Sequence, residues 1–266
     1  MMPPDTFQPA AFDAFAATYD ATFSHTPLGE MLRSRVWESL ARHFTPGQRI
    51  LELACGTGED AIWLARRGVR VMATDGSAEM LSQTWRKAQQ GGVFLETRQL
   101  ALQAIAQGLP VDLTGERFDG ALSNFGGLNT LSDWSGLAQG LARLIWPGGK
   151  LVLVPMGPLC PWEIAWYGLH GDGRRAWRRL GRATAWVGSA EIPIYYPSAR
   201  SLRRACAPHF RHVETRALGC LLPPSYLGHF VARYPRFFER LNRLERALAR
   251  PLGGLGDHYL SVFERI

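Results

Sequence analysis

A glycine-rich turn between a short apolar run and a helical segment constrains this chain most strongly. Residues 51–58 read LELACGTG, and the next apolar run ends at Asp75, 17 residues beyond Gly58. Glycine is needed where a chain turns tightly and lets a ligand touch its backbone. An acid at the end of the second strand of such a unit accepts hydrogen bonds from ribose hydroxyls. The two features together predict an α/β domain that binds a ligand containing ribose.

Two other interpretations of the turn are less favoured. A nicotinamide dinucleotide requires a later glycine, as in G-x-G-x-x-G, and the turn ACGTG lacks it. A strand-to-helix turn without any ligand would not explain why an acid follows at this spacing. The sequence therefore favours a nucleoside-bearing ligand other than a dinucleotide.

Strand-like and helix-like segments alternate along most of the chain. Alternation at this spacing implies crossover connections and a doubly wound, mostly parallel sheet. Seven strands are predicted, at residues 49–54, 69–74, 93–98, 118–123, 150–155, 210–218 and 258–265. The main helices are predicted at residues 28–43, 59–67, 77–90, 131–145 and 197–207.

The chain divides into a cap, a main domain and two insertions. We expect residues 1–45 to form an N-terminal helical cap and residues 46–266 the main domain, with lid insertions at about 157–190 and 223–254. The insertions follow strands in the carboxyl-terminal half, where open α/β sheets build their ligand crevice.

Composition narrows the class of protein further. No apolar run is long enough to cross a bilayer, and residues 1–10 do not resemble a secretory signal, so we expect a cytoplasmic protein. The four cysteines have no metal-ligand spacing, and we expect neither a metal site nor disulfides. Residues 157–266 hold 17 Lys and Arg against 8 Asp and Glu, a net charge of +9, while residues 1–156 carry −2. This basic part is typical of contact with an anionic substrate, membrane surface or nucleic acid.

Residues 46–156 resemble the class I S-adenosylmethionine-dependent methyltransferases, in particular the ubiquinone/menaquinone and "type 11" group. The resemblance rests on LELACGTG, ATDGSAEML, FDGALSNFGGLN and LARLIWPGGKLVLV, taken in order. FDAFAATYD before them, and YPSARSLRRACAPHF and DHYLSVFER after them, extend it to most of the chain. The resemblance implies a Rossmann-like fold with S-adenosylmethionine as cofactor and S-adenosylhomocysteine as product.

The resemblance also implies roles for individual residues. It places Gly56 and Gly58 beneath the methionine part of the cofactor and Glu52 near its amino group. Asp75 is expected to hold the ribose, with Gly76 beside the adenosine.

Five further residues are assigned to the same site. Asn124 and Phe125 are expected where the sulfonium meets the acceptor, and Tyr19 to close the pocket from above. Ala54 replaces the glycine that often opens the loop, which we expect to cost little because φ there stays negative. Gln99 is a candidate partner for the adenine, because the acid that often follows the third strand is missing.

The acceptor is predicted to be a small, hydrophobic or amphipathic molecule, methylated by in-line displacement. A general base is not required for such a reaction; His25, His170 and Tyr19 are weak candidates because they lie in capping segments. Two alternatives stay open. The chain could bind the cofactor without catalysis, as a partner protein, or it could methylate nucleic acid, although no known nucleic-acid-binding module is visible.

Both insertions interleave aromatic and basic residues. Arg174, Arg178 and residue 182 are expected on one face of a helix in the first insertion. In the second insertion, apolar side chains recur at helical spacing beside a row of arginines; they are Phe230, Tyr234, Phe237, Leu241, Leu244 and Leu248. We expect this apolar face to pack on the body of the protein. The alternative is that the insertions bind a lipophilic or anionic acceptor, in peripheral contact with a membrane.

Overall fold

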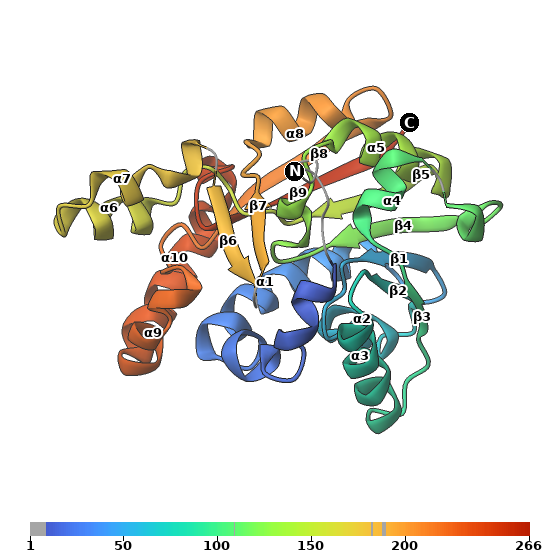
Figure 1. The fold of residues 1–266 in the computed structure, drawn as a ribbon, viewed down its shortest axis with the longest axis horizontal. Helices are drawn as coiled ribbons and strands as arrows, with labels where there is room; N and C mark the ends of the chain where they lie inside the picture. Colours follow the sequence, from blue (N-terminus) through green and yellow to red (C-terminus); the bar gives the residue numbers. More distant parts are fainter. Residues whose placement is uncertain (1–8, 109, 182, 188–189) are drawn as a thin grey trace.

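The computed structural model describes residues 9–108, 110–181, 183–187 and 190–266, and a seven-stranded sheet forms its centre (Figure 1). The sheet order is β3-β2-β1-β4-β5-β9-β8; the first five strands are parallel, and β9 runs antiparallel to both of its neighbours. The strands are β1 (Arg49–Leu53), β2 (Arg70–Asp75), β3 (Glu96–Gln99), β4 (Phe118–Ser123), β5 (Ile145–Leu153), β8 (Phe210–Leu218) and β9 (His258–Arg265). The predicted doubly wound, mostly parallel architecture is confirmed.

Two hydrophobic clusters cover the two faces of this sheet. One cluster holds side chains of α1 (Pro27–His43), α2 (Glu59–Ala65) and α3 (Ala78–Gln90). The other cluster holds side chains of α4 (Leu102–Gln107), α5 (Trp134–Leu144) and α8 (Ala199–Cys206). Because both faces are covered, the carboxyl ends of the parallel strands form the open edge where a ligand can enter.

Local capping explains where two predicted elements differ from those observed. The third strand begins at Glu96, because the Val93 N–H bonds to Ala88 O at 3.0 Å and completes the end of α3. The predicted helix at 131–145 is observed as α5 but begins only at Trp134, and a 3₁₀ turn, η4 (Gly127–Thr130), precedes it. Asp133 caps α5 by accepting two backbone N–H bonds.

The segment expected to form the N-terminal cap contains η1 (Pro9–Phe15), η2 (Asp20–Ser24) and α1. Leu28, Leu32, Val36 and Leu40 of α1 are spaced four residues apart and are fully buried against the sheet. The first segment, η1, lies against α3, where the Ser77 hydroxyl donates to Asp13. The cap is therefore joined both to the sheet and to the edge where β2 ends.

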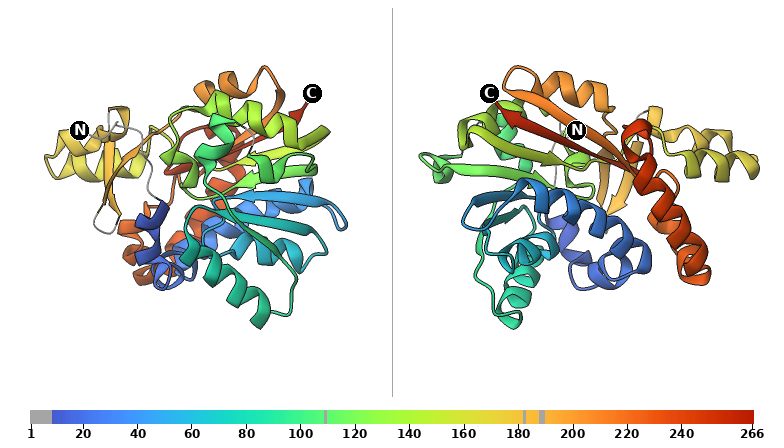
Figure 2. Two further views of the ribbon diagram at one scale, coloured as in Figure 1. Left: turned by 45° about the vertical axis from the view of Figure 1, so that its right-hand side comes forward. Right: turned by 180° about the vertical axis from the view of Figure 1, so that it is seen from behind.

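The two insertions project from the same side of the molecule (Figures 1 and 2). The first comprises α6 (Pro161–Leu169), α7 (Gly173–Ala176), η5 (Arg178–Leu180) and an antiparallel hairpin of β6 (Ala183–Val187) and β7 (Ala190–Ile194). The second comprises η6 (Ser225–Leu227), α9 (His229–Arg233) and α10 (Pro235–Leu252). No helix among the described residues has both the length and the apolar character needed to cross a bilayer. All four cysteines are free.

The prediction of a single helix containing Arg174 and Arg178 was wrong. The chain turns at Trp177, so Arg174 and Arg178 lie in separate short helices, and residue 182 is outside the described residues. Arg179 is buried in ion pairs with Glu163 and with Asp257, at 2.5 and 2.6 Å. It fastens the first insertion to the loop that precedes β9, and so it has a structural role.

Candidate functional site

The glycine-rich turn after β1 has a left-handed backbone at three positions. Gly56 and Gly58 have φ of 57° and 79°, and a Cβ on Gly58 would lie 2.5 Å from the Thr84 methyl. Ala54 also has a positive φ, 49°, so the expectation of a negative φ there was wrong. This conformation costs an L-residue about 1–2 kcal/mol. The Ala54 methyl fits because residue 127 is glycine: a Cβ there would lie 2.4 Å from it.

Asp75 holds this turn in place from the end of β2. Its Oδ2 accepts the Gly56 N–H at 2.9 Å, and its Oδ1 accepts the Ser77 N–H at 2.9 Å. An ionised carboxylate can accept about four hydrogen bonds, so two acceptor positions remain. Burial raises the pKa of Asp75, although hydrogen bonds from the backbone N–H groups of Ser77, Gly56 and Gly76 oppose the rise. The carboxylate thus fixes the loop and still presents free acceptors to a ligand.

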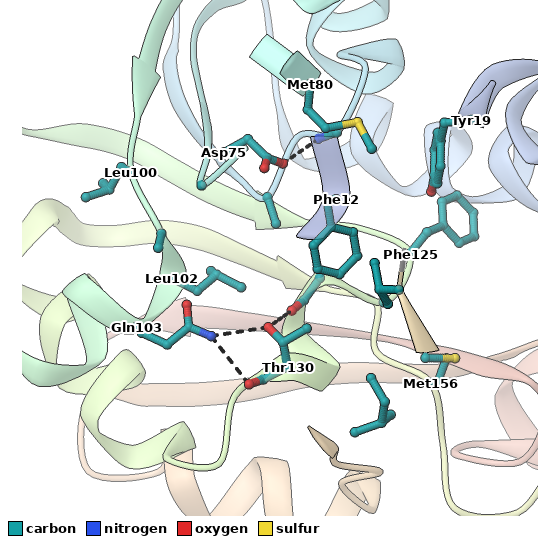
Figure 3. Close-up of a pocket in the computed structure, with 18 residues that line it drawn as sticks. Phe12, Tyr19, Asp75, Met80, Leu100, Leu102, Gln103, Phe125, Thr130 and Met156 are labelled. Atoms are coloured by element: carbon teal, nitrogen blue, oxygen red, sulfur yellow. Dashed lines mark hydrogen bonds between the residues drawn. The ribbon is translucent and has the colours of Figure 1, made fainter. Parts of the chain in front are cut away.

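A cavity of about 250 Å³ lies over the carboxyl ends of the strands (Figure 3). It extends from Asp75, the last residue of β2, and Leu100, just after β3, to Phe125 and Met156, which follow β4 and β5. The β6–β7 hairpin contributes Val187 and Ile194 to its lining. Most of its lining side chains are apolar, and among the described residues no arginine or lysine lines it. The lining comprises Phe12, Tyr19, Ala54, Gly56, Asp75, Gly76, Met80, Leu100, Ala101, Leu102, Gln103, Phe125, Gly126, Gly127, Thr130, Met156, Val187 and Ile194.

A second, smaller cavity of about 30 Å³ is polar and adjoins the first. Tyr19, Ala54, Gly56 and Phe125 line both of them, so the two cavities share a wall. The remaining lining of the small cavity comes from Arg33, Glu52, Cys55, Thr57, Glu59, Asp60 and Asn124.

Charged and amide groups around the small cavity form a network centred on Asp60. Its carboxylate accepts from Arg33 Nη1 at 2.7 Å, from Asn124 Nδ2 at 2.8 Å and from Trp37 Nε1 at 2.7 Å. Three buried polar atoms in the cavity wall have no partner: Arg33 Nε, Glu52 Oε2 and Asn124 Oδ1. Because unpaired buried polar groups are costly, such atoms mark the place of a polar ligand. A donor beside two acceptors suits a head group that carries both an ammonium and a carboxylate.

Burial shifts the pKa values of Glu52 and Tyr19, which both line this wall. Burial raises the pKa of the Glu52 carboxyl well above its usual range, and the Asp60 carboxylate adds to the rise. Burial also raises the pKa of Tyr19 to about 12, so its hydroxyl stays protonated near neutral pH and can donate rather than act as a base.

Several predicted residues lie together, whereas others do not. Tyr19, Glu52, Ala54, Gly56, Asp75, Gly76, Asn124 and Phe125 line one or both cavities, and Gly58 shapes the loop between them. Gln99 lines neither cavity, and its side-chain amide donates to Gly76 O at 3.1 Å.

Neither of the two candidate histidines lines either cavity. His170 is exposed on the first insertion, with its Nδ1 2.7 Å from Trp166 O. His25 lies near Asp20 and Glu59, but the Lys87 ammonium donates to both of these carboxylates. This group is therefore an ion-pair network, and its geometry does not support His25 as a base.

Sequence reasoning missed the residues that distant segments bring to the site. Arg33 and Asp60 come from α1 and α2, Phe12 comes from η1, and Ile194 comes from the hairpin. Figure 3 shows Phe12 projecting into the large cavity between Met80 and Thr130. The one signal available for Arg33 was a charged residue next to the apolar stripe of a helix, which is too common to be specific.

Comparison with known proteins agrees with this geometry. Residues 50–149 match the family described as Methyltransferase domain. A demethylmenaquinone methyltransferase from Clavibacter sepedonicus is 34% identical over 144 residues, which cover 54% of this chain and 56% of the relative. The chain thus spans about half the length of the curated relatives it matches.

Solved structures share the fold over most of the chain. An S-adenosylmethionine-dependent methyltransferase from Mesorhizobium loti superposes with a TM-score of 0.59 at 19% identity, covering 91% of this chain and 99% of the other. The DhpI–SAH complex gives a TM-score of 0.58 at 19% identity, covering 97% and 95%. At these identities the likeness shows the fold. Residues 50–149 therefore resemble a methyltransferase domain, set in a fold that the chain shares with S-adenosylmethionine-dependent methyltransferases.

Proposed function

We propose that the chain binds S-adenosylmethionine across the two cavities and transfers its methyl group to a small lipophilic acceptor. The observation that carries this proposal is the shared wall between a polar cavity with three unpaired buried atoms and an apolar cavity that begins at Asp75. An amino-acid head group fits the first cavity, and a ribose and base fit the second. The DhpI–SAH complex, on the same fold, supports this ligand.

Different residues would bind different parts of the cofactor. Glu52 and Asn124 would accept from the ammonium, Arg33 would donate to the carboxylate, and Asp75 would accept from the ribose hydroxyls. When bound, the cofactor supplies a sulfonium methyl group for in-line displacement. The chain's own contribution is to position the reactants and exclude water, which needs no general base. Tyr19 and Phe125, in the shared wall, would lie beside the reacting centre.

The acceptor is assigned to the part of the large cavity beyond β4 and β5. Phe125, Met156, Val187 and Ile194 line this part, and it contains no charged side chain among the described residues. Such a lining favours a neutral, apolar molecule over a carboxylate, a phosphate or nucleic acid. The resemblance to a demethylmenaquinone methyltransferase supports a quinone-like acceptor. Because such acceptors partition into lipid, we further propose that the protein is cytoplasmic and meets its acceptor at a membrane surface.

Calorimetry and a turnover assay test the two halves of this proposal. The purified chain should bind S-adenosylmethionine and S-adenosylhomocysteine, and it should release S-adenosylhomocysteine when a demethylated naphthoquinol is supplied. Absence of binding would overturn the proposal as a whole. Binding without turnover on any quinol or phenol would leave a non-catalytic binding protein as the function.

Substitution of Ile194 tests where the acceptor lies. A larger side chain in Ile194→Trp should fill the acceptor end and raise the KM for the acceptor at least ~tenfold. The Kd for S-adenosylmethionine should change less than about twofold, because the cofactor is assigned elsewhere. Trp186→Ala, an exposed position on the same hairpin, is the matched control and should change neither value. An unchanged KM in Ile194→Trp would remove the acceptor from this end of the cavity.

Substitution of Glu52 separates stability from binding. A carboxyl whose pKa is raised by folding holds its proton more tightly in the folded chain, so stability falls as pH rises from the ordinary glutamate pKa toward the raised one. Glu52→Gln should abolish this loss and raise the free energy of unfolding at neutral pH by about 1–3 kcal/mol. It should also weaken S-adenosylmethionine binding about 10-fold or more, because glutamine cannot ionise to balance the charge of the bound ammonium, as the Glu52 carboxyl can. Denaturation at several pH values and calorimetry measure the two effects; an unchanged affinity would place the ammonium elsewhere.

A further inference from the structure

The helix α10 presents an apolar stripe to solvent. Tyr234, immediately before the helix, and Phe237 are each 55% exposed, and Leu244 and Leu248 are 51% and 38% exposed. Leu241, between them, is partly buried and packs against the core at the edge of the stripe. The spacing of three or four residues puts all five on one helical face.

This stripe is not the face that holds α10 on the protein. The helix packs through Phe238, Glu245 and Ala249, which are buried. Glu245 forms an ion pair with Arg35 of α1 and accepts the backbone N–H of Gly219 at 2.7 Å. The expectation that the apolar stripe packs on the body holds for Phe230 and Leu241, which contact the core. It was wrong for Tyr234, Phe237, Leu244 and Leu248, which stay exposed and are free for another role.

Arginines border the stripe on the side away from the body. Arg233, Arg236, Arg240 and Arg243 are all exposed. No ion pair joins any of these four to a carboxylate within the part of the chain that the structure describes. Two neighbouring arginines differ: Arg246 pairs with Glu38 at 2.7 Å, and Arg250 with Glu214 at 3.2 Å. The four uncompensated cations thus lie directly beside exposed apolar side chains.

We propose that this α10 surface docks on an anionic phospholipid bilayer, with the helix axis in the plane of the membrane. An interfacial helix buries an apolar stripe at the boundary between headgroups and acyl chains, while its basic flank contacts anionic headgroups. Tyr234 and Phe237 supply aromatic rings, which favour that boundary. Docking requires neither cofactor nor turnover, so it is independent of the proposed methyl transfer.

The charge pattern argues against two other partners for this surface, a second copy of the chain and a nucleic acid. A second copy of the chain packed along the same stripe would bring two rows of arginines together without a compensating carboxylate. A nucleic acid would engage the arginines but would leave the stripe of tyrosine, phenylalanine and leucine in water. A lipid surface satisfies both halves of the pattern at once.

The first insertion adds two exposed leucines to this side of the molecule. Leu169 and Leu180 in the α6–η5 segment are 86% and 60% exposed. Trp166 of α6 packs against Phe230 of α9 with ring centroids 5.6 Å apart, which joins the two insertions. Figure 2 shows both insertions projecting together from the sheet.

Co-sedimentation with vesicles tests the proposal. The full chain should bind vesicles of phosphatidylcholine mixed with phosphatidylglycerol and should bind vesicles of phosphatidylcholine alone much more weakly. Arg236→Glu combined with Arg240→Glu should lower partitioning onto the anionic vesicles at least ~tenfold. Phe237→Ser combined with Leu244→Ser should also lower it at least ~tenfold, with the charge unchanged.

The matched control is Arg200→Glu combined with Arg204→Glu, two exposed arginines of α8 with no apolar stripe beside them. It changes the net charge equally and should leave most of the binding intact. Equal losses in both arginine pairs would show non-specific attraction and overturn the proposal. Unchanged binding to the anionic vesicles after the serine substitutions would also overturn the proposal. That result is expected of a nucleic-acid site, which uses the arginines and not the apolar stripe. Loss of a dimer in ultracentrifugation after those substitutions, without vesicle binding by the parent chain, would assign the stripe to a second copy instead.

Discussion

Asp75→Ala is expected to weaken S-adenosylmethionine binding more than about 100-fold, because hydrogen bonds to a charged acceptor each contribute about 1.5–3 kcal/mol. The substitution removes both acceptors proposed for the ribose. It also frees the N–H groups of Gly56 and Ser77, which the carboxylate holds at 2.9 Å. The loop would then lose the contact that fixes its left-handed turn. The effect on affinity should therefore exceed the effect of losing the ribose contacts alone.

Calorimetry with S-adenosylhomocysteine measures this loss, and Asp133→Ala is the matched control. Asp133 also accepts two backbone N–H bonds, from Ser135 and Gly136 at 3.0 and 2.9 Å, but it caps α5 and does not line the large cavity. Asp133→Ala should lower the melting temperature and leave the Kd unchanged. If Asp75→Ala bound the ligand as tightly as the parent chain, the ribose would not lie at this carboxylate.

The central sheet could be predicted because its signals are local. Most of the strands and helices between residues 49 and 155 follow from apolar runs and glycines that are adjacent in sequence. The pairing order then follows from the topology of doubly wound sheets. Glu52, Gly56 and Asp75 could be named from the same short segments. Ala54 shows the limit: its positive φ depends on the space left by Gly127, 73 residues away.

The packing of α10 illustrates what local patterns leave open. Its helical character was readable from spacing, but two apolar faces lie about 100° apart, one containing Phe237 and the other containing Phe238. The buried face is decided by Glu245, whose partner Arg35 is 210 residues distant in sequence. No periodicity within the helix contains that information. The exposed face is consequently the one for which an external partner has to be sought.

Arg33→Met is expected to destabilise the protein by about 3–5 kcal/mol, since it leaves a buried carboxylate without its cation. Arg33 is buried, donates to Asp60 at 2.7 Å and lies over the Phe125 ring, 5.0 Å from its centroid. After the change, Asp60 would keep only the neutral donors of Trp37 and Asn124. S-adenosylmethionine affinity should fall at least ~tenfold as well, because the donor proposed for its carboxylate is gone.

Two further variants distinguish an effect of Arg33 on cofactor binding from its effect on stability. Arg35→Met breaks the other buried ion pair of α1, with Glu245, and should lower the free energy of unfolding to a similar extent while leaving the Kd for S-adenosylmethionine unchanged. The double variant Arg33→Met with Asp60→Asn removes both charges, so it should recover most of the stability but none of the affinity. Denaturant unfolding and calorimetry on the same preparations distinguish these outcomes. If affinity returned together with stability in the double variant, Arg33 would act only through the fold, and the carboxylate of the cofactor would need another partner.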